Sequence, residues 1–158
     1  LVEQELVDLA AGLAAVAMLG DTSAIGIDDV VGATFNGNFV ELDRALDRVF
    51  AEGGHPVQLV RALQRHADQL HLVAGYKAAG MPADVAIGKA RGLPRFGPVR
   101  QRFERHLNSW SVKVLSSALN AILDAELECK STGLPDETIA RRLCQRLAQA
   151  GPDARRKR

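Results

Sequence analysis

One long stretch between two sets of helix-breaking residues limits what this chain can fold into. Residues 56–80 follow Gly53-Gly54-His55 and precede Met81-Pro82, and no proline interrupts positions 57–80. Apolar side chains recur there every three or four residues, which predicts a helix with one buried face. They are Leu59, Val60, Leu63, Ala67, Leu70, Val73, Ala74 and Tyr76. At about 1.5 Å per residue such a helix is about 35 Å long, enough for shorter helices to pack along it.

Seven further segments carry helical patterns and are separated by glycine, proline or asparagine. The expected helices cover residues 1–19, 27 or 28 to 35, 39–52, 82–90, 95–107, 110–130 and 136–150. We expect Asn38 to cap the 39–52 helix, and Asn108 or Ser109 to cap the 110–130 helix. Gly97-Pro98 is expected to make its helix irregular, and Gly151-Pro152 to end the last one. The prediction is an all-α protein, an orthogonal bundle of about seven to eight helices.

The composition agrees with packed helices. Hydrophobic residues make up 47% of the chain but only seven residues are aromatic, so alanine and leucine dominate. Cys129 and Cys144 have no metal-like spacing, which favours small buried hydrophobic roles in a reduced, cytoplasmic protein. The longest apolar run, residues 9–19, is too short to span a bilayer and follows acidic residues, so we expect neither a signal peptide nor a membrane partner. The chain begins without methionine, which hints at a piece of a longer protein.

The formal charge of +1 hides an uneven distribution of charge along the chain. Residues 1–54 hold ten Asp and Glu against two Arg, whereas residues 55–158 hold eighteen Lys and Arg against nine Asp and Glu. Such a division is typical of solvated helix faces. It also permits an acidic surface at one end of the molecule and a surface that faces a polyanion at the other.

Catalytic and cofactor-binding patterns are missing from the sequence. It contains neither GxxxxGK[ST] nor a GxGxxG that follows a strand, so we expect no nucleotide cofactor. His66 and His71 are five residues apart, about 140° around a helix, and therefore do not share a metal-facing side. His55 and His106 have no acidic partner of ligand type nearby. We expect structural or surface roles for all four histidines, and neither a metal site nor a catalytic residue.

One basic segment indicates a possible function. It contains Lys89, Arg91, Arg95, Phe96, Arg100, Arg102 and Arg105, with Glu104 as its one acid. Basic side chains with an aromatic can grip a phosphate backbone and stack on an unpaired base. The alternative is a solvated basic helix face over a core phenylalanine, because charge clusters of this size are common on soluble helices. The residue types leave both interpretations open. The candidate contacts with DNA or with another subunit are Lys89, Arg91, Arg95, Phe96, Arg100 and Arg102.

A series of short motifs follows in order along the chain. They are Gly20-Asp21-Thr22-Ser23-Ala24, Ile27-Asp28-Asp29-Val30, Leu42-Asp43-Arg44-Ala45-Leu46, Glu52-Gly53-Gly54-His55-Pro56-Val57, Leu59 through Arg65-His66, Gly80-Met81-Pro82, Leu93-Pro94-Arg95-Phe96, Trp110-Ser111 and residues 126–133. In order and spacing they resemble the C-terminal part of the delta subunit of the bacterial DNA polymerase III clamp loader. The resemblance covers about residues 20–150. The family more often has aspartate where Glu126 stands, and residues 1–19 match less well.

The resemblance implies that residues 20–151 are a helical collar domain. It also implies that residues 1–19 are the remnant of a preceding helical lid domain or a linker helix. The Gly151-Pro152 breaker and the basic run after it predict a disordered tail over residues 152–158. In the family this collar assembles with those of the delta-prime and tau/gamma subunits above primer–template DNA. The delta subunit has no working ATP site, although it belongs to a DNA-directed DNA polymerase holoenzyme, a nucleotidyltransferase. Two function classes follow: a non-catalytic assembly domain of the clamp loader, or a helical nucleic-acid-binding or adaptor domain of unrelated role.

Overall fold

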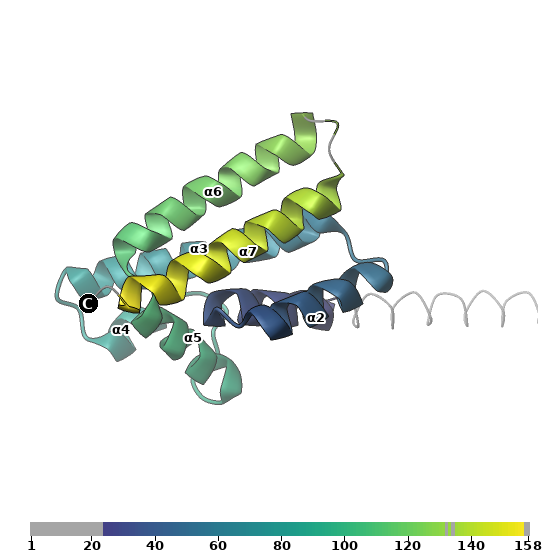
Figure 1. Cartoon of the computed structure of the whole chain (residues 1–158). Helices are drawn as coiled ribbons and strands as arrows, with labels where there is room; N and C mark the ends of the chain where they lie inside the picture. The colour runs from purple at the N-terminus through teal and green to yellow at the C-terminus, as the bar shows by residue number, and fades with distance from the viewer. Residues whose placement is uncertain (1–23, 132, 134, 157–158) are drawn as a thin grey trace, which may run out of the picture.

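The computed structural model of this chain describes residues 24–131, 133 and 135–156, with the backbone alone for 152–156 (Figure 1). The described residues form helices and connecting turns without a strand, which confirms the all-α prediction. A first helical segment covers residues 24–36. It is followed by α2 (Phe39–Ala51), α3 (Pro56–Ala78), α4 (Ala83–Gly88), α5 (Pro98–Ser109), α6 (Val112–Ser131) and α7 (Asp136–Arg156). The helix expected over residues 1–19 lies outside the described residues.

The long helix α3 is the element against which α4, α5, α6 and α7 pack. Helices α6 and α7 form an antiparallel pair joined by a short connection, and α2 lies against α7 (Figure 1). Proline at the first position of α3 needs no hydrogen-bond partner for its nitrogen, and the left-handed Gly80 follows its C-terminus. Among the described helices, none is long and apolar enough to cross a membrane.

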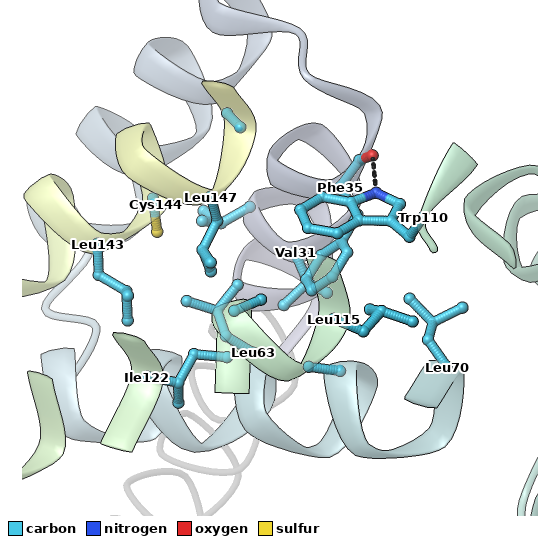
Figure 2. Close-up of a cluster of buried hydrophobic side chains, with 14 of the residues drawn as sticks. Val31, Phe35, Leu63, Leu70, Trp110, Leu115, Ile122, Leu143, Cys144 and Leu147 are labelled. Carbon is cyan, nitrogen blue, oxygen red and sulfur yellow. Dashed lines mark hydrogen bonds between the residues drawn. The ribbon is translucent and has the colours of Figure 1, made fainter. Parts of the chain in front are cut away.

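The core lies between α3, α6, α7 and the segment 24–36. The predicted stripe of α3 is confirmed, with Leu59, Leu63, Ala67 and Leu70 all fully buried. Leu115 and Ile122 of α6 and Leu143, Cys144 and Leu147 of α7 complete a continuous apolar cluster (Figure 2). Burial of one leucine side chain stabilises the fold by about 1.5–3 kcal/mol relative to leaving it in water.

The start of α2 is as predicted, because the Asn38 side chain accepts a hydrogen bond from the Glu41 backbone N–H at 3.2 Å. The predicted cap of α6 is wrong. Ser111 caps that helix by accepting a hydrogen bond from the Val114 N–H at 3.3 Å. The Ser109 hydroxyl instead donates to the Arg105 carbonyl, one turn back in α5, so it is committed to the preceding helix.

The predicted boundaries of α5 and α7 also need correction. Helix α5 begins at Pro98 and not at residue 95, because Gly97 has a φ of 101° and turns the chain before the helix starts. At the other end, Gly151 does not stop α7, which continues to Arg156. A Cβ atom at Gly151 would overlap the indole of Trp110, so this glycine serves close packing between α7 and Trp110.

Two large apolar side chains that follow the apolar spacing of their helices are exposed. Leu127 of α6 is 55% exposed and Phe39 of α2 is 46% exposed, although both follow the apolar spacing of their helices. Helix α6 packs on both α3 and α7. Its small alanines Ala118, Ala121 and Ala125 face those neighbours, and this arrangement leaves Leu127 outside.

Candidate functional site

The basic segment lies mainly in the connection between α4 and α5. Lys89, Arg91 and Arg95 are exposed, and none of them makes an ion pair with another described residue. The connection is tied to α3 through Gln69, whose side-chain amide donates to the Arg91 carbonyl at 2.8 Å. Three cationic side chains are therefore available to an outside partner on a segment whose backbone is anchored.

Phe96 lies in the same connection and is 85% exposed. The spacing of positions 96, 99 and 103 predicts one apolar face of a helix. Because α5 starts only at Pro98, Phe96 is separated from Phe103, which is 1% exposed. An exposed aromatic side chain between free cations is suited to stack on a planar group of a partner.

Arg100 and Arg102 differ from the exposed cations because both are engaged within the molecule. Arg100 donates to Glu104 at 2.7 Å and to Asp84 at 3.3 Å. Arg102 forms a bidentate pair with Asp28, at 2.9 and 2.8 Å. This pair joins α5 to the segment 24–36, raises the pKa of Arg102 and lowers that of Asp28, mainly through the hydrogen bonds between them. The six candidate residues thus divide into four exposed ones and two paired arginines.

A pair of histidines behind this surface connects three helical segments. His66 Nε2 lies 2.8 Å from His106 Nδ1, and His106 Nε2 lies 2.8 Å from the Asn36 side-chain oxygen. Because the Asn36 oxygen can only accept, His106 carries its hydrogen on Nε2 and accepts from His66 through Nδ1. The Phe35 ring stands edge-on to His66, with ring centroids 4.7 Å apart.

Burial keeps both histidines neutral. Loss of hydration lowers the pKa of His66 to about 4 and that of His106 to about 3. The nearby Arg102 guanidinium lowers the pKa of both further, and the His66 ring disfavours a charge on His106. The pair is therefore a hydrogen-bonded structural element at neutral pH and not a charged site.

A cavity of about 320 Å³ adjoins His66. Residues from the segment 24–36, from α3, from the connection before α5 and from α5 itself line it, and they include Asp28, Arg65, His66, Gln69 and Arg102. The sequence did not predict this cavity, because the residues that line it are far apart along the chain. One signal was present: His66 falls on the stripe of Leu63 and Leu70, and such a position predicts burial.

The cysteines and acidic residues do not form a metal centre within the described part of the chain, where no group of three or more His, Cys, Asp or Glu could hold a metal ion. Cys144 is fully buried and burial raises the pKa of its thiol to about 12, so it packs as a small hydrophobic side chain. Cys129 is half-buried. Neither thiol has the exposed, electropositive surroundings of a nucleophile.

Comparisons with protein-family models, with curated proteins and with solved structures found no match for this chain. The site has to be interpreted from its own geometry. That geometry offers exposed cations beside an exposed phenylalanine, a set of hydrogen-bonded polar side chains, and a cavity that Asp28, His66 and Arg102 help to line.

Proposed function

We propose that this chain is a non-catalytic assembly domain of a bacterial replication clamp loader, corresponding to the collar of its delta subunit. The ordered series of motifs over residues 20–150 carries the proposal. The all-helical bundle agrees with it, since a collar of this kind is built from packed helices. On this proposal the partners are the delta-prime and tau/gamma subunits, and the assembled complex holds primer–template DNA.

Exposed apolar side chains support an assembly role. Leu123 and Leu127 lie one turn apart on α6 and are 51% and 55% exposed. Contiguous apolar groups on the surface of a soluble domain mark interaction sites, because leaving them in water is unfavourable. We assign this face of α6 to a subunit contact.

The assembly proposal is tested by mixing the chain with purified delta-prime and tau/gamma subunits and following co-elution by size-exclusion chromatography. We expect a stable complex that Leu123→Glu with Leu127→Glu disrupts. The matched control is Val40→Glu on α2, which is 63% exposed and should leave the complex intact. Failure of the unmodified chain to enter any complex with these subunits contradicts the proposal.

A second candidate function, a helical nucleic-acid-binding or adaptor domain of unrelated role, is favoured by the exposed cations around Phe96. The two functions differ in the residues encoded upstream of Leu1. A clamp-loader subunit requires an AAA+-like α/β domain there, whereas an unrelated adaptor does not. Sequencing the upstream coding region therefore distinguishes them independently of any binding assay.

A further inference from the structure

Helix α7 presents a row of polar side chains to solvent. Arg142, Gln145, Arg146 and Gln149 are all exposed and lie within about two turns of the helix. Residues 138–152 contain no Asp or Glu, so no carboxylate of α7 interrupts the row. Guanidinium groups only donate hydrogen bonds and the glutamine amides can donate as well, so this face suits a partner rich in acceptors.

The two arginines of this row lie one turn apart and are unpaired. Neither Arg142 nor Arg146 makes an ion pair with a residue that the structure describes. Their neighbour Arg141 is different, because it pairs with Glu137 one turn back at 3.1 Å and with Asp47 of α2 at 2.8 Å. Like charges one turn apart slightly disfavour a helix, and anions bound outside would relieve that repulsion.

The positive charge continues toward the C-terminal end of α7, because the helix does not stop at Gly151. Backbone position 156 lies about four turns beyond Arg142 and therefore on the same side of the helix, about 20 Å along its axis. The sequence after Pro152 holds one acid, Asp153, against four cations: Arg155, Arg156, Lys157 and Arg158. Cations in a last turn favour the helix dipole, but this effect does not account for the unpaired arginines near the middle of α7.

The composition of this face indicates the kind of partner. Among the described side chains of α7, no large hydrophobic one is exposed, in contrast to Leu123 and Leu127 of α6. A protein interface has an apolar centre with few charges, and a helix that lies on a membrane needs an apolar face. The phosphate backbone of DNA needs neither, because cations and hydrogen-bond donors hold it.

We propose that the solvent face of α7, formed by Arg142, Gln145, Arg146, Gln149 and the basic residues after Pro152, binds the phosphate backbone of duplex DNA without reading its sequence. A duplex carries about one negative charge per 1.7 Å of its axis, which offers several phosphates to a row of this length. This surface differs from the segment around Phe96, because it has no exposed ring that could stack on an unpaired base. The inference does not depend on the clamp-loader proposal, because the surface belongs to this chain alone.

The test is a titration of a fluorescently labelled duplex of about 20 base pairs with the whole chain, followed by fluorescence anisotropy at several salt concentrations. We expect a dissociation constant of about 10⁻⁵ M at about 50 mM salt, within the range of non-specific DNA binding. A duplex of unrelated sequence should bind equally well. A single strand of the same length should bind more weakly, because its charge density is lower.

Three double variants locate the binding surface. Arg142→Gln with Arg146→Gln should weaken duplex binding at least about tenfold and reduce the slope of log affinity against log salt by about 1.8, or about 0.9 for each phosphate no longer neutralised. Arg142→Lys with Arg146→Lys keeps both charges and should keep the slope. The matched control is Arg61→Gln with Arg65→Gln, which removes two exposed charges at the same spacing from α3, where the acid Asp68 lies within one turn. It should leave the slope unchanged, while circular dichroism verifies that every variant is folded.

Four outcomes would overturn the inference. The duplex might give no saturable binding up to about 100 µM protein. The two glutamine variants might lower the slope equally, which would mean that binding follows net charge and not the α7 face. Phe96→Ala might weaken duplex binding as much as the α7 variant, which would assign the DNA to the other basic surface. Finally, vesicles that contain phosphatidylserine might bind more tightly than the duplex, with the same dependence on Arg142 and Arg146.

Discussion

The bundle formed by α3, α6 and α7 buries alanine, leucine, isoleucine and valine, whereas the corner where the segment 24–36, α3 and α5 meet is held together by hydrogen bonds between polar side chains. In the bundle, Leu63, Leu115 and Leu147 contribute through apolar area, and small changes in orientation cost little. In the polar corner (Asp28, Asn36, His66, Arg102 and His106), each contact depends on one particular partner at 2.8–2.9 Å. Each polar side chain in the corner therefore needs one particular partner, whereas the apolar side chains of the bundle do not.

The largest expected effect contrasts two phenylalanines seven residues apart. Phe103→Ala should lower the free energy of unfolding by about 3–5 kcal/mol, because it removes a fully buried ring that also stands edge-on to His66. Phe96→Ala should change it by less than about 0.5 kcal/mol, since its ring is in solvent. Urea denaturation of both variants measures the difference. Similar decreases in the two would show that Phe96 belongs to the core.

The sequence predicted the bundle well because apolar spacing decides which face of a helix is buried. The stripe of α3, with Leu63 near its centre, was predicted without any knowledge of the helices that pack against it. It could not predict the polar corner, because the bonds there join positions far apart. His66 and His106 are 40 residues apart, and Asp28 and Arg102 are 74 apart. For the candidate site, the exposed cations were identified, but the internal pairing of Arg100 and Arg102 depended on acids in other elements.

The next prediction concerns acid stability. The pKa of His66 is about 4 in the folded chain and near 6.5 when the chain is unfolded. Between pH 4 and pH 6.5 the unfolded state therefore binds more protons than the folded state. Stability is therefore full above pH 6.5 and decreases as the pH falls, by up to about 1.4 kcal/mol per pH unit for each such histidine. His66 alone accounts for about 3 kcal/mol by pH 4.

His66→Gln removes this titration and should reduce the slope of the unfolding free energy against pH over that window, by up to about 1.4 kcal/mol per pH unit, while the contribution of His106 remains. The variant is less stable at pH 7, because His106 Nδ1 then depends on the amide for its hydrogen bond. Urea denaturation at several pH values between 7 and 4 gives both slopes. If the unfolding free energies of the variant and the unmodified chain change equally with pH, His66 is not held neutral in the folded chain.

A smaller effect on stability is expected where Gly151 of α7 packs against the Trp110 ring. Gly151→Ala places a methyl group against the Trp110 indole, whose Nε1–H is held by the Phe35 carbonyl at 3.0 Å. The ring cannot move away freely, so we expect the free energy of unfolding to fall by about 1–3 kcal/mol.

Gly75→Ala in α3 is the matched control, because nothing lies within 4 Å of the added methyl group. It should stabilise the chain by about 0.5–1 kcal/mol, since alanine favours the helix more than glycine does. Thermal unfolding of the two variants should shift in opposite directions. A shift in the same direction would mean that the Trp110 packing is loose.

The most direct test of the account compares exposed with paired arginines in primer–template binding by a reassembled clamp loader that contains this chain. We expect Arg91→Gln with Arg95→Gln to weaken binding and to reduce the slope of log affinity against log salt by about 0.7–0.9 for each phosphate that the protein no longer neutralises. Arg100→Gln should leave that slope unchanged, because Arg100 is held by Glu104 and Asp84. Unchanged affinity and slope in the double variant, with subunit assembly intact, would contradict the proposed role of the exposed segment.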